Sequence, residues 1–332
     1  MKIGVLCSGG DAPGMNPCLR AIVRAGEKYG DVIVGIRHGY QGIFDEDIWG
    51  GIDEDGKDHK LNPREVSGLT NRGGAFLNSS RCMRMHEEEG QKQAAEILTR
   101  HGFDALITIG GNGTLSGALA LGSFWKGQVV GLPGTIDNDL LGSDYTIGFQ
   151  TATQTGVEAV DKLRDTAGSH DMMFLVEVMG RHCGDLAAYI ALAGGCELVA
   201  TPEVKTDVED IVRRLRRFKA MGKRSLLMVV AEGDDFGGAN ALLNALKDAG
   251  APYEMRSVVL GHVQRGGTPV PGDRILATRL GCFAVDAIHQ GATGVMAGEL
   301  SGQLILSPFE NVIVGRRSGA VQVTNLIDRI SV

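Results

Sequence analysis

The sequence predicts an α/β fold of two lobes, with mainly parallel sheets that helices cover on both faces. Short β-branched and apolar runs alternate with amphipathic segments, as is typical of strands buried between two layers of helices. The chain has 332 residues, of which 43% are hydrophobic, so it can bury a core large enough for two lobes. Its 49 glycines cluster at the ends of the predicted strands, where sharp turns beside bound groups are expected.

The alternation places each element in order, because a strand is a short β-branched run and a helix has apolar residues at helical spacing. Strands are expected at Ile3–Cys7, Val32–Arg37, Ala105–Ile109, Gln128–Leu132, Met173–Met179, Ser225–Ala231 and Ser257–Leu260. Helices are expected at Pro17–Gly26, Gln91–His101, Thr114–Leu121, Thr151–Leu163, Asp185–Leu192, Val208–Met221, Ala239–Ala249 and Arg274–Ile288. The acidic segment Asp45–Asp58 is expected to form an exposed hairpin or loop.

Charge and composition exclude several classes of partner. The net charge is -7, and no basic block is present that could follow a nucleic acid backbone. The chain opens on the strand-like Lys2–Leu6 and has no apolar run long enough to cross a bilayer, so we expect a cytoplasmic protein without a membrane partner. The six cysteines lack paired spacing and are expected to be reduced packing residues: Cys7, Cys18, Cys82, Cys183, Cys196 and Cys282.

The predicted strand Ala105–Ile109 closes on the glycine-rich turn Gly110-Gly-Asn-Gly-Thr114, which leads into a helix. Glycine reaches φ > 0 and lacks a Cβ, so peptide N–H groups can surround a phosphate at the positive end of that helix. The same string also forms ordinary tight turns, so a phosphate site is one of two interpretations that the turn alone allows.

Other predicted strands also end in polar segments, and ligands of open α/β sheets bind beyond the carboxyl ends of the strands. Ile3–Cys7 runs into a second glycine-rich turn, Ser8-Gly-Gly-Asp-Ala-Pro-Gly-Met-Asn16. Gln128–Leu132 runs into Pro133-Gly-Thr-Ile-Asp-Asn-Asp139, in which two carboxylates are two residues apart. Two later strands are followed by Gly180-Arg-His-Cys-Gly-Asp185 and by Glu232-Gly233. These strand ends together predict a ligand site.

A series of segments along nearly the whole chain resembles the 6-phosphofructokinase family. They are Ser8–Asn16, Asn71-Arg-Gly-Gly74, Pro133–Asp139, Asp144-Tyr-Thr-Ile-Gly-Phe149, Val176-Glu-Val-Met-Gly-Arg181 and Leu260-Gly-His-Val-Gln-Arg-Gly-Gly267. The resemblance implies the phosphofructokinase fold of two Rossmann-like lobes. The larger lobe, which binds ATP and Mg²⁺, is expected at 1–148 plus 261–311, and the smaller, which binds the sugar phosphate, at 149–260 plus 312–332.

The resemblance also implies an activity: Mg²⁺-dependent transfer of the γ-phosphoryl of ATP, or a phosphoryl of pyrophosphate, to the 1-hydroxyl of fructose 6-phosphate. Members of this family act as homo-oligomers, and a tetramer is expected here. The catalytic residues implied are Asp137 as general base, Thr135, Arg81 and Arg181, while Asp139 is implied as a Mg²⁺ ligand. An Asx-turn in which both acids only accept backbone N–H groups is the structural alternative.

The remaining ligand contacts follow from the same motifs. Those implied for the nucleotide are Gly10, Arg81, Cys82, Gly111, Asn112, Gly113 and Thr114. Those implied for the sugar phosphate are Thr135, Asp137, Met179, Gly180, Arg181, Glu232, Arg256, His262 and Arg265, with Arg256 reaching the site of a neighbouring subunit. Gly113 and Gly134 favour ATP, because pyrophosphate users in this family tend to carry aspartate and lysine at these positions.

Two residues depart from the family pattern. Asn112 stands where an aspartate normally helps to hold Mg²⁺, and an amide keeps the oxygen but loses the charge. Met172 stands where an arginine commonly reaches the sugar phosphate across an interface, a contact worth ~1.5–3 kcal/mol. The alternatives are therefore a kinase of another sugar phosphate, a pyrophosphate-dependent enzyme, and a weakly active paralogue that binds these ligands as a regulator.

A regulatory site is the last expectation from the resemblance. Bacterial members bind nucleoside diphosphate or phosphoenolpyruvate between subunits, and the matching residues are Arg20, Arg24, Arg72, Arg164, Glu197, Lys223 and Arg224. Met221 replaces a basic residue of that set. Exposed arginines on a solvated helix face are the alternative interpretation.

Overall fold

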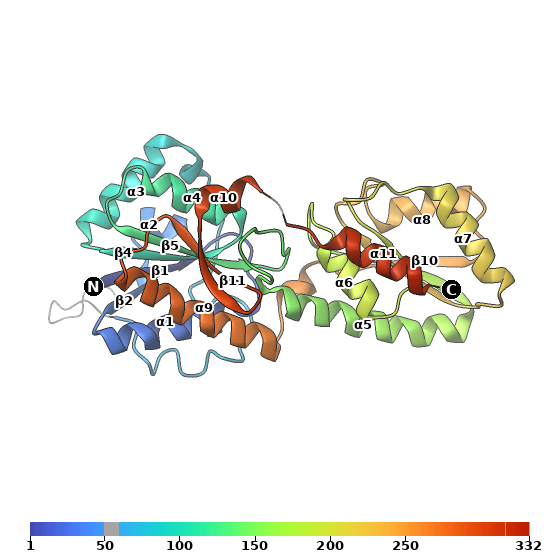
Figure 1. The fold of residues 1–332 in the computed structure, drawn as a ribbon, viewed down its shortest axis with the longest axis horizontal. Helices are drawn as coiled ribbons and strands as arrows, with labels where there is room; N and C mark the ends of the chain where they lie inside the picture. The colour runs from blue at the N-terminus through green and yellow to red at the C-terminus, as the bar shows by residue number, and fades with distance from the viewer. Residues whose placement is uncertain (50–59, 316, 332) are drawn as a thin grey trace. The chain divides into compact units, whose positions relative to one another are not determined.

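The computed structural model describes residues 1–49, 60–315 and 317–331. The chain forms two compact units, in each of which helices pack against a sheet (Figure 1). The larger unit comprises Met1–Thr135, Leu140–Gln150 and Arg265–Arg316, and the smaller comprises Ile136–Asp139, Thr151–Gln264 and Arg317–Val332. Neither unit is a continuous stretch of sequence. Which ligand each unit binds stays a prediction.

A mainly parallel sheet forms the centre of the larger unit. β1 (Lys2–Cys7) lies between β2 (Val32–Ile36) and β4 (Ala105–Gly110), and β5 (Gln128–Thr135) pairs with β4, all in parallel. The outer strands are β3 (Ile48–Trp49), β11 (Val295–Leu300) and β12 (Gln303–Pro308), and the full order is β12-β11-β5-β4-β1-β2-β3. β6 (Ile147–Gly148) pairs with the end of β5. Because Cys7 aligns with Ile109 and Gly110 with Pro133, the polar segments that follow β1, β4 and β5 emerge at the same edge of the sheet.

Helices cover both faces of this sheet. α1 (Met15–Tyr29) and α9 (Pro271–His289) pack side by side on one face, while α3 (Glu88–Arg100), α4 (Asn112–Gly122) and α10 (Phe309–Val314) lie on the other (Figure 1). Leu115, Ala118 and Leu121 recur at helical spacing along α4 and pack into one core with Leu106 of β4. The short elements α2 (Tyr40–Phe44) and η1 (Met83–His86) complete this unit.

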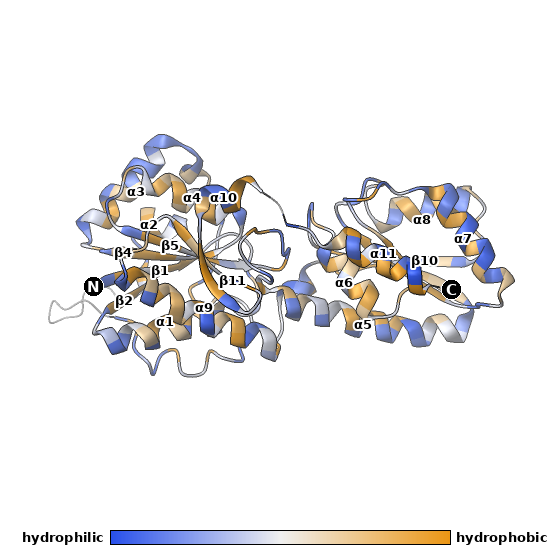
Figure 2. Ribbon diagram, in the orientation of Figure 1, coloured by the Kyte–Doolittle hydropathy of each residue, from blue (hydrophilic) through white to orange (hydrophobic). Residues whose placement is uncertain are grey.

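The smaller unit has an all-parallel sheet of order β10-β7-β9-β8, formed by Glu254–Val259, Met172–Val178, Leu226–Ala231 and Leu198–Ala200. Leu226, Met228 and Val230 of β9 share a core with residues of α7 (Val208–Ala220) and α8 (Ala239–Asp248). The alternate residues of β9 are buried as well, since α6 (Asp185–Ala193) packs on the sheet and α11 (Ala320–Ile330) packs on α6. Hydrophobic and hydrophilic residues alternate visibly along α7 in Figure 2, as expected for a helix that covers a core. α5 (Phe149–His170) and η2 (Gly261–Arg265) complete the element order.

Several elements were not predicted from the sequence. The antiparallel hairpin of β11 (Val295–Leu300) and β12 (Gln303–Pro308) turns at Ser301 and Gly302, both with positive φ, as a two-residue type I′ turn requires. Serine is an uncommon residue at such a position, so the turn lacked the usual asparagine–glycine signal. β8 was also missed because it has only three residues, and the amphipathic helix α11 was not predicted.

Of the acidic segment expected to form a hairpin or loop, residues 50–58 lie outside the described residues. The part before them contains the short strand β3 (Ile48–Trp49), which pairs antiparallel with β2. All six cysteines are free thiols, five of them buried. Among the described helices, none combines the length and the hydrophobicity that crossing a bilayer requires.

Candidate functional site

The two glycine-rich turns of the larger unit are joined by buried hydrogen bonds. The Thr114 hydroxyl donates to the carbonyl oxygen of Ser8 at 2.9 Å, and the backbone N–H of Ser8 donates to the carbonyl oxygen of Ile109 at 3.0 Å. The Tyr40 hydroxyl donates to the carbonyl oxygen of Thr114 at 2.8 Å, which holds the first turn of α4 from its other side. A Cβ on Gly110 would overlap the Thr114 hydroxyl, so this close approach requires glycine.

Asn112 is the first residue of α4, and Gly111 is its N-cap. No side chain caps this helix and no acidic residue lies in its first turn, so its positive end carries no compensating charge from the helix itself. The Ser116 hydroxyl donates to the carbonyl oxygen of Asn112 at 2.9 Å, one turn along the helix. This geometry is the kind that accepts a phosphate group.

The two glycines used to infer the phosphoryl donor have different surroundings. A Cβ on Gly113 would meet no heavy atom within 4 Å, so space is open beside it. A Cβ on Gly134 would lie 2.9 Å from Cγ2 of Ile109 and 3.0 Å from Cε of Met15. Gly111 is also close to its neighbours, since its Cβ would lie 3.4 Å from Cβ of Thr135. Aspartate would therefore fit at 113 far more easily than lysine at 134.

The second glycine turn is held by the segment that precedes Arg81. The backbone N–H of Gly9 donates to the carbonyl oxygen of Ser80 at 3.1 Å, and the Ser79 hydroxyl donates to the carbonyl oxygen of Gly9 at 2.8 Å. Arg81 is exposed and Cys82 is buried directly after this contact. The structure thus brings the predicted residues Gly10 and Arg81 into adjoining segments.

Arg265 also lies against the second turn. Its Nη1 donates to the carbonyl oxygen of Asp11 at 3.1 Å, and a Cβ on Gly10 would overlap the guanidinium. The sequence predicted that Arg265 contacts the sugar phosphate. In the structure its partner is the carbonyl oxygen of Asp11, next to Gly10, whose backbone N–H is predicted to bind the γ-phosphate. Any side chain at position 10 would therefore have to displace the Arg265 guanidinium from this contact.

The chain leaves the larger unit after Thr135, whose buried carbonyl oxygen accepts the Thr146 hydroxyl at 2.6 Å. Asp137, in the smaller unit, is only 5% exposed. Its Oδ2 lies 3.8 Å from Nε of Arg181, so the predicted base and a predicted substrate arginine are neighbours within that unit. Asp139 is half-buried, and its carbonyl oxygen accepts the backbone N–H of Arg317 at 3.4 Å.

The turn after β7 is shaped by contacts to two other segments of the smaller unit. Arg181 has a φ of 52°, and its N–H donates to Oε1 of Glu232 at 3.0 Å. Gly233 permits this approach, because a Cβ there would overlap the carbonyl oxygen of Arg181. The N–H of Met179 donates to Oε1 of Gln264 at 2.9 Å. The predicted residues Met179, Arg181 and Glu232 therefore meet around one turn.

His262 and Arg256 are more exposed than these residues. His262 lies in η2, beside the buried Gln264. Arg256 lies on β10, the edge strand of the smaller sheet, and its ion pair with Glu254 is loose at 3.6 Å. Met172, at the start of β7, is only 6% exposed and is in register with Glu254. The methionine that stands here in place of an arginine is therefore buried within this chain.

Three of the predicted effector residues meet in the smaller unit. The buried Glu197 lies 3.1 Å from Nζ of Lys223 and 3.8 Å from Nη1 of Arg164, and its Oε2 accepts the N–H of Leu227 at 2.9 Å. Arg224 instead pairs with Asp171 at 2.7 Å. Arg20, Arg24 and Arg72 belong to the larger unit. An effector site stays a prediction.

Cys183 lies in the turn between Arg181 and α6, where burial raises the pKa of its thiol to about 12. Such a thiol stays protonated at neutral pH and does not act as a nucleophile. The sequence analysis assigned no role to Gln264 or Asp185. Gln264 lies in the family-like segment Leu260–Gly267, and Asp185 ends the polar segment Gly180–Asp185. Each forms a buried hydrogen bond with a predicted site segment, and no local pattern marks such a contact.

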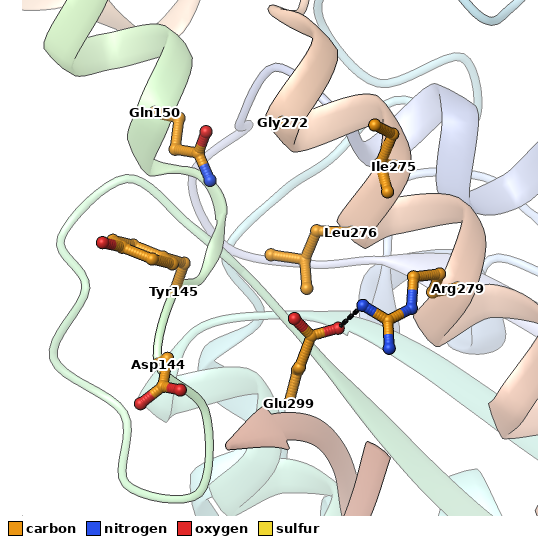
Figure 3. A pocket seen from close by; sticks show the side chains of 8 residues that line it. All are labelled: Asp144, Tyr145, Gln150, Gly272, Ile275, Leu276, Arg279 and Glu299. Atoms are coloured by element: carbon orange, nitrogen blue, oxygen red, sulfur yellow. Dashed lines mark ion pairs between the residues drawn. The ribbon is translucent and has the colours of Figure 1, made fainter. Parts of the chain in front are cut away.

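A pocket of about 120 Å³ lies elsewhere in the larger unit and contains none of the predicted site residues. Figure 3 shows its lining, in which Arg279 of α9 forms an ion pair with Glu299 of β11, and Asp144 and Tyr145 lie on the opposite wall. Oδ2 of Asp144 accepts the N–H of Ser301 at 2.5 Å, so this part of the Asp144–Phe149 segment anchors the hairpin. Its visible role is structural.

Comparison with known proteins identifies relatives along the whole chain. The model of the family described as Phosphofructokinase matches residues 2–288. The chain is 46% identical to ATP-dependent 6-phosphofructokinase 1 of Thermus thermophilus over 316 residues, which cover 95% of each protein. It is 42% identical to ATP-dependent 6-phosphofructokinase of Paenibacillus macquariensis over 330 residues, which cover 99% of this chain and 98% of that protein.

Solved structures agree on the fold. Phosphofructokinase from Saccharomyces cerevisiae matches with a TM-score of 0.83 and 32% identity, and the match covers 99% of this chain. This chain spans 46% of the length of the yeast chain. Pyrophosphate-dependent phosphofructokinase from Marinobacter aquaeolei matches with a TM-score of 0.82, covering 97% of this chain and 86% of that one, but at 20% identity this likeness concerns the fold alone.

Proposed function

Since the chain belongs to the phosphofructokinase family, we propose that it transfers the γ-phosphoryl group of ATP to the 1-hydroxyl of fructose 6-phosphate, forming fructose 1,6-bisphosphate in glycolysis. The observation that carries this proposal is the 42–46% identity, over nearly the full chain, to relatives named ATP-dependent 6-phosphofructokinase. The enzyme is thus a phosphotransferase with an alcohol acceptor.

The nucleotide phosphates are proposed to bind at the glycine-rich turns of the larger unit. Backbone N–H groups around Gly10 and at the N-terminus of α4 would donate to the phosphate oxygens. Thr114 supports this role indirectly, because its hydroxyl is already used to join the two turns. Arg81 is exposed beside the second turn and would neutralise charge that develops on the transferring group.

The acceptor hydroxyl is proposed to lose its proton to Asp137. A general base must hold a fixed position, and burial of this carboxylate beside the Arg181 guanidinium restricts it. Arg181 would also contact the substrate, and its backbone is fixed by the hydrogen bond to Glu232. Positioning of the attacking oxygen and charge neutralisation account for most of the catalysis in phosphoryl transfer.

Mg²⁺ is proposed as the cofactor, held by Asp139 with a weaker contribution from Asn112. The donor set fits this ion, because Mg²⁺ bound to a nucleotide needs one or two protein oxygens and takes its other ligands from phosphates and water. The half-buried carboxylate of Asp139 would supply one oxygen, while the Asn112 amide would supply an uncharged one. When bound, the ion neutralises phosphate charge.

The choice of ATP over pyrophosphate is supported by the open space at Gly113. An aspartate there would occupy space that the α-phosphate of ATP is proposed to use. We further propose a cytoplasmic homotetramer, as the family resemblance implies, with the exposed Arg256 on the edge strand β10 as a residue that a neighbouring subunit would contact. Sedimentation velocity of the wild type would test this assembly.

A coupled assay with ATP, Mg²⁺ and fructose 6-phosphate tests the function. The wild type should turn over at an ordinary kinase rate, and Asp137→Asn should lower kcat by about 10²–10⁴-fold, as loss of a general base does. The same assay with pyrophosphate and with other sugar phosphates tests the alternatives. Wild-type turnover no higher than that of Asp137→Asn, with nucleotide and sugar phosphate still bound in calorimetry, would instead favour a regulatory paralogue, as Asn112 and Met172 together allow.

A further inference from the structure

Asp185 is a buried carboxylate of the smaller unit to which the phosphoryl-transfer proposal gives no role. It is the first residue of α6 and is 1% exposed. Its Oδ2 accepts the side-chain amide of Asn138 at 3.0 Å, while its Oδ1 accepts the Ser318 hydroxyl at 3.0 Å and the backbone N–H of Gly319 at 2.6 Å. The carboxylate therefore joins three segments that lie far apart in the sequence.

Asn138 lies between the proposed base Asp137 and the proposed metal ligand Asp139. Its φ of 55° is in the left-handed region, which asparagine adopts more readily than most residues. At a residue with positive φ, the side chains before and after it point in other directions than they would along a strand. The conformation of Asn138 therefore sets the directions of the Asp137 and Asp139 carboxylates. Asn138 is 2% exposed, and its side-chain amide donates to Asp185.

The segment held by the other oxygen of Asp185 also touches this turn. The N–H of Arg317 donates to the carbonyl oxygen of Asp139 at 3.4 Å, directly before Ser318 and Gly319. Asp185 thus supports residues 137–139 twice, through Asn138 and through the segment 317–319. A carboxylate suits this position because both of its oxygens accept hydrogen bonds, whereas an amide offers one acceptor.

Glu203 provides an internal comparison. Its Oε1 accepts the N–H of Gly184 at 2.8 Å and lies 2.7 Å from the Ser318 hydroxyl, whose single proton it shares with Asp185, so it supports the same neighbouring segments. No hydrogen bond joins Glu203 to Asn138 in the described part of the chain. Loss of Glu203 should therefore loosen the surroundings without releasing Asn138.

We propose that Asp185 is a positioning residue for phosphoryl transfer: through Asn138 it fixes the turn that presents Asp137 and Asp139. The proposal rests on the function proposed above, because it assigns a task to that turn. It differs from a purely structural role in one respect. Across variants, kcat must fall when the Asn138–Asp185 hydrogen bond is lost. It must not fall merely because the smaller unit is less stable.

The test compares Asp185→Asn, the exchanged pair Asn138→Asp with Asp185→Asn, and the control Glu203→Gln. Asp185→Asn leaves one acceptor oxygen where Asn138 and Gly319 need two, so the hold on the turn weakens, and it should lower kcat about 10–100-fold, as loss of an outer supporting residue commonly does, with KM for ATP within about twofold. The exchanged pair restores a donor opposite an acceptor and should recover most of kcat. Glu203→Gln should keep kcat within about threefold at a similar loss of Tm.

Two results would overturn the proposal: wild-type kcat in Asp185→Asn, or an equal loss of kcat in Glu203→Gln at matched Tm. If Asp185→Asn does not fold, Asn138→Gly takes its place, because glycine accepts the positive φ while removing the amide, and it should show the same loss.

A wild type inactive with ATP and fructose 6-phosphate would contradict the proposed function but not the role of Asp185 in holding the turn. Amide hydrogen exchange of a peptide spanning 136–141 separates the two, since it needs no turnover. Asp185→Asn should speed exchange of that peptide at least about tenfold relative to the wild type, and Glu203→Gln should not. Equal exchange in all three proteins would remove the positioning role whichever substrate the enzyme uses.

Discussion

The Thr114 hydroxyl and the carbonyl oxygen of Ser8, which are 106 residues apart in sequence, form a buried hydrogen bond of 2.9 Å. This bond ties the N-terminus of α4 to the turn that follows β1, so the two proposed phosphate-binding turns have a fixed relative position. Their backbone N–H groups can then be arranged around one nucleotide before it binds, which lowers the entropic cost of binding.

Replacing Thr114 tests this connection. Thr114→Val should lower the free energy of unfolding by about 1–3 kcal/mol, because the carbonyl oxygen of Ser8 loses its buried donor, and should raise KM for ATP. Thr114→Ser keeps the hydroxyl and serves as the control. Urea unfolding and initial-rate kinetics measure the two effects. Equal behaviour of the valine and serine variants would show that the bond does not hold the turns.

Asn112→Asp should affect both stability and metal use. A carboxylate at the first residue of α4 meets the positive end of a helix that has no other acidic residue in its first turn, so stability should rise by about 0.3–1 kcal/mol at low salt. The variant should also raise kcat or lower the Mg²⁺ concentration needed for half-maximal rate. Asn112→Ala is the control for loss of the amide. A fall in kcat with aspartate would mean that the site is organised around the amide.

The donor preference should change only when Gly113 and Gly134 are replaced together. Gly113→Asp enters open space and should alter stability by less than about 0.5 kcal/mol, whereas Gly134→Lys must displace Ile109 and Met15 and should cost about 1–3 kcal/mol. Thermal unfolding of the single variants checks the steric part. Assays of the double variant with ATP and with pyrophosphate check the preference, and unchanged use of ATP would contradict it.

Met172→Arg should lower KM for fructose 6-phosphate about tenfold or more if this sugar is the acceptor, because it restores a charge-assisted contact worth ~1.5–3 kcal/mol. Since Met172 is 6% exposed, the variant should also lose stability, and Met172→Leu controls for the change in packing. KM for ATP, measured in parallel, shows whether the effect is confined to the sugar phosphate. A KM for the sugar phosphate equal to that of the leucine variant would contradict the inferred interface contact.

Buried thiols predict a loss of stability in alkali. Burial raises the pKa values of Cys7, Cys183 and Cys196 to about 12 from an ordinary 9.0, so above pH 9 the unfolded chain releases protons that the folded chain retains. Their contribution to folding is complete below pH 9 and declines as pH rises toward 12. Chemical denaturation at pH 8, 9, 10 and 11 measures the decline. The variant with Cys183→Ala and Cys196→Ala should show a smaller slope, and an unchanged slope would assign it to other groups.

Much of the fold could be predicted from sequence because its central strands are continuous apolar runs and its helices carry regular apolar faces. The strand expected at Ala105–Ile109 is observed as Ala105–Gly110, and the helix expected at Val208–Met221 as Val208–Ala220. The strands at the edge of the larger sheet were less predictable. The β11–β12 hairpin depends on positive φ at Ser301, and the dipeptide Ser301-Gly302 indicates such a turn less strongly than asparagine–glycine would.

The candidate site, too, could be predicted only in part. Glycine turns and the residues after strands are local signals, so Gly10, Asn112 and Asp137 could be proposed from their motifs. The contact of Arg265 with Asp11 and that of Asn138 with Asp185 join residues far apart in the chain, and only the packed structure reveals them. The difference between the open space at Gly113 and the crowding at Gly134 is likewise a property of packing.

The interrupted course of the chain also bears on its synthesis. Most of the smaller unit, Thr151–Gln264, is a single stretch, whereas the larger sheet lacks β11 until residues after Gln264 have been made. During synthesis, the part of β5 that pairs with β11, at Val130 and Gly131, therefore stays unpaired while the whole smaller sheet is translated. Exposed strand edges invite wrong pairing. During this interval the nascent chain exposes a strand edge that the finished fold covers.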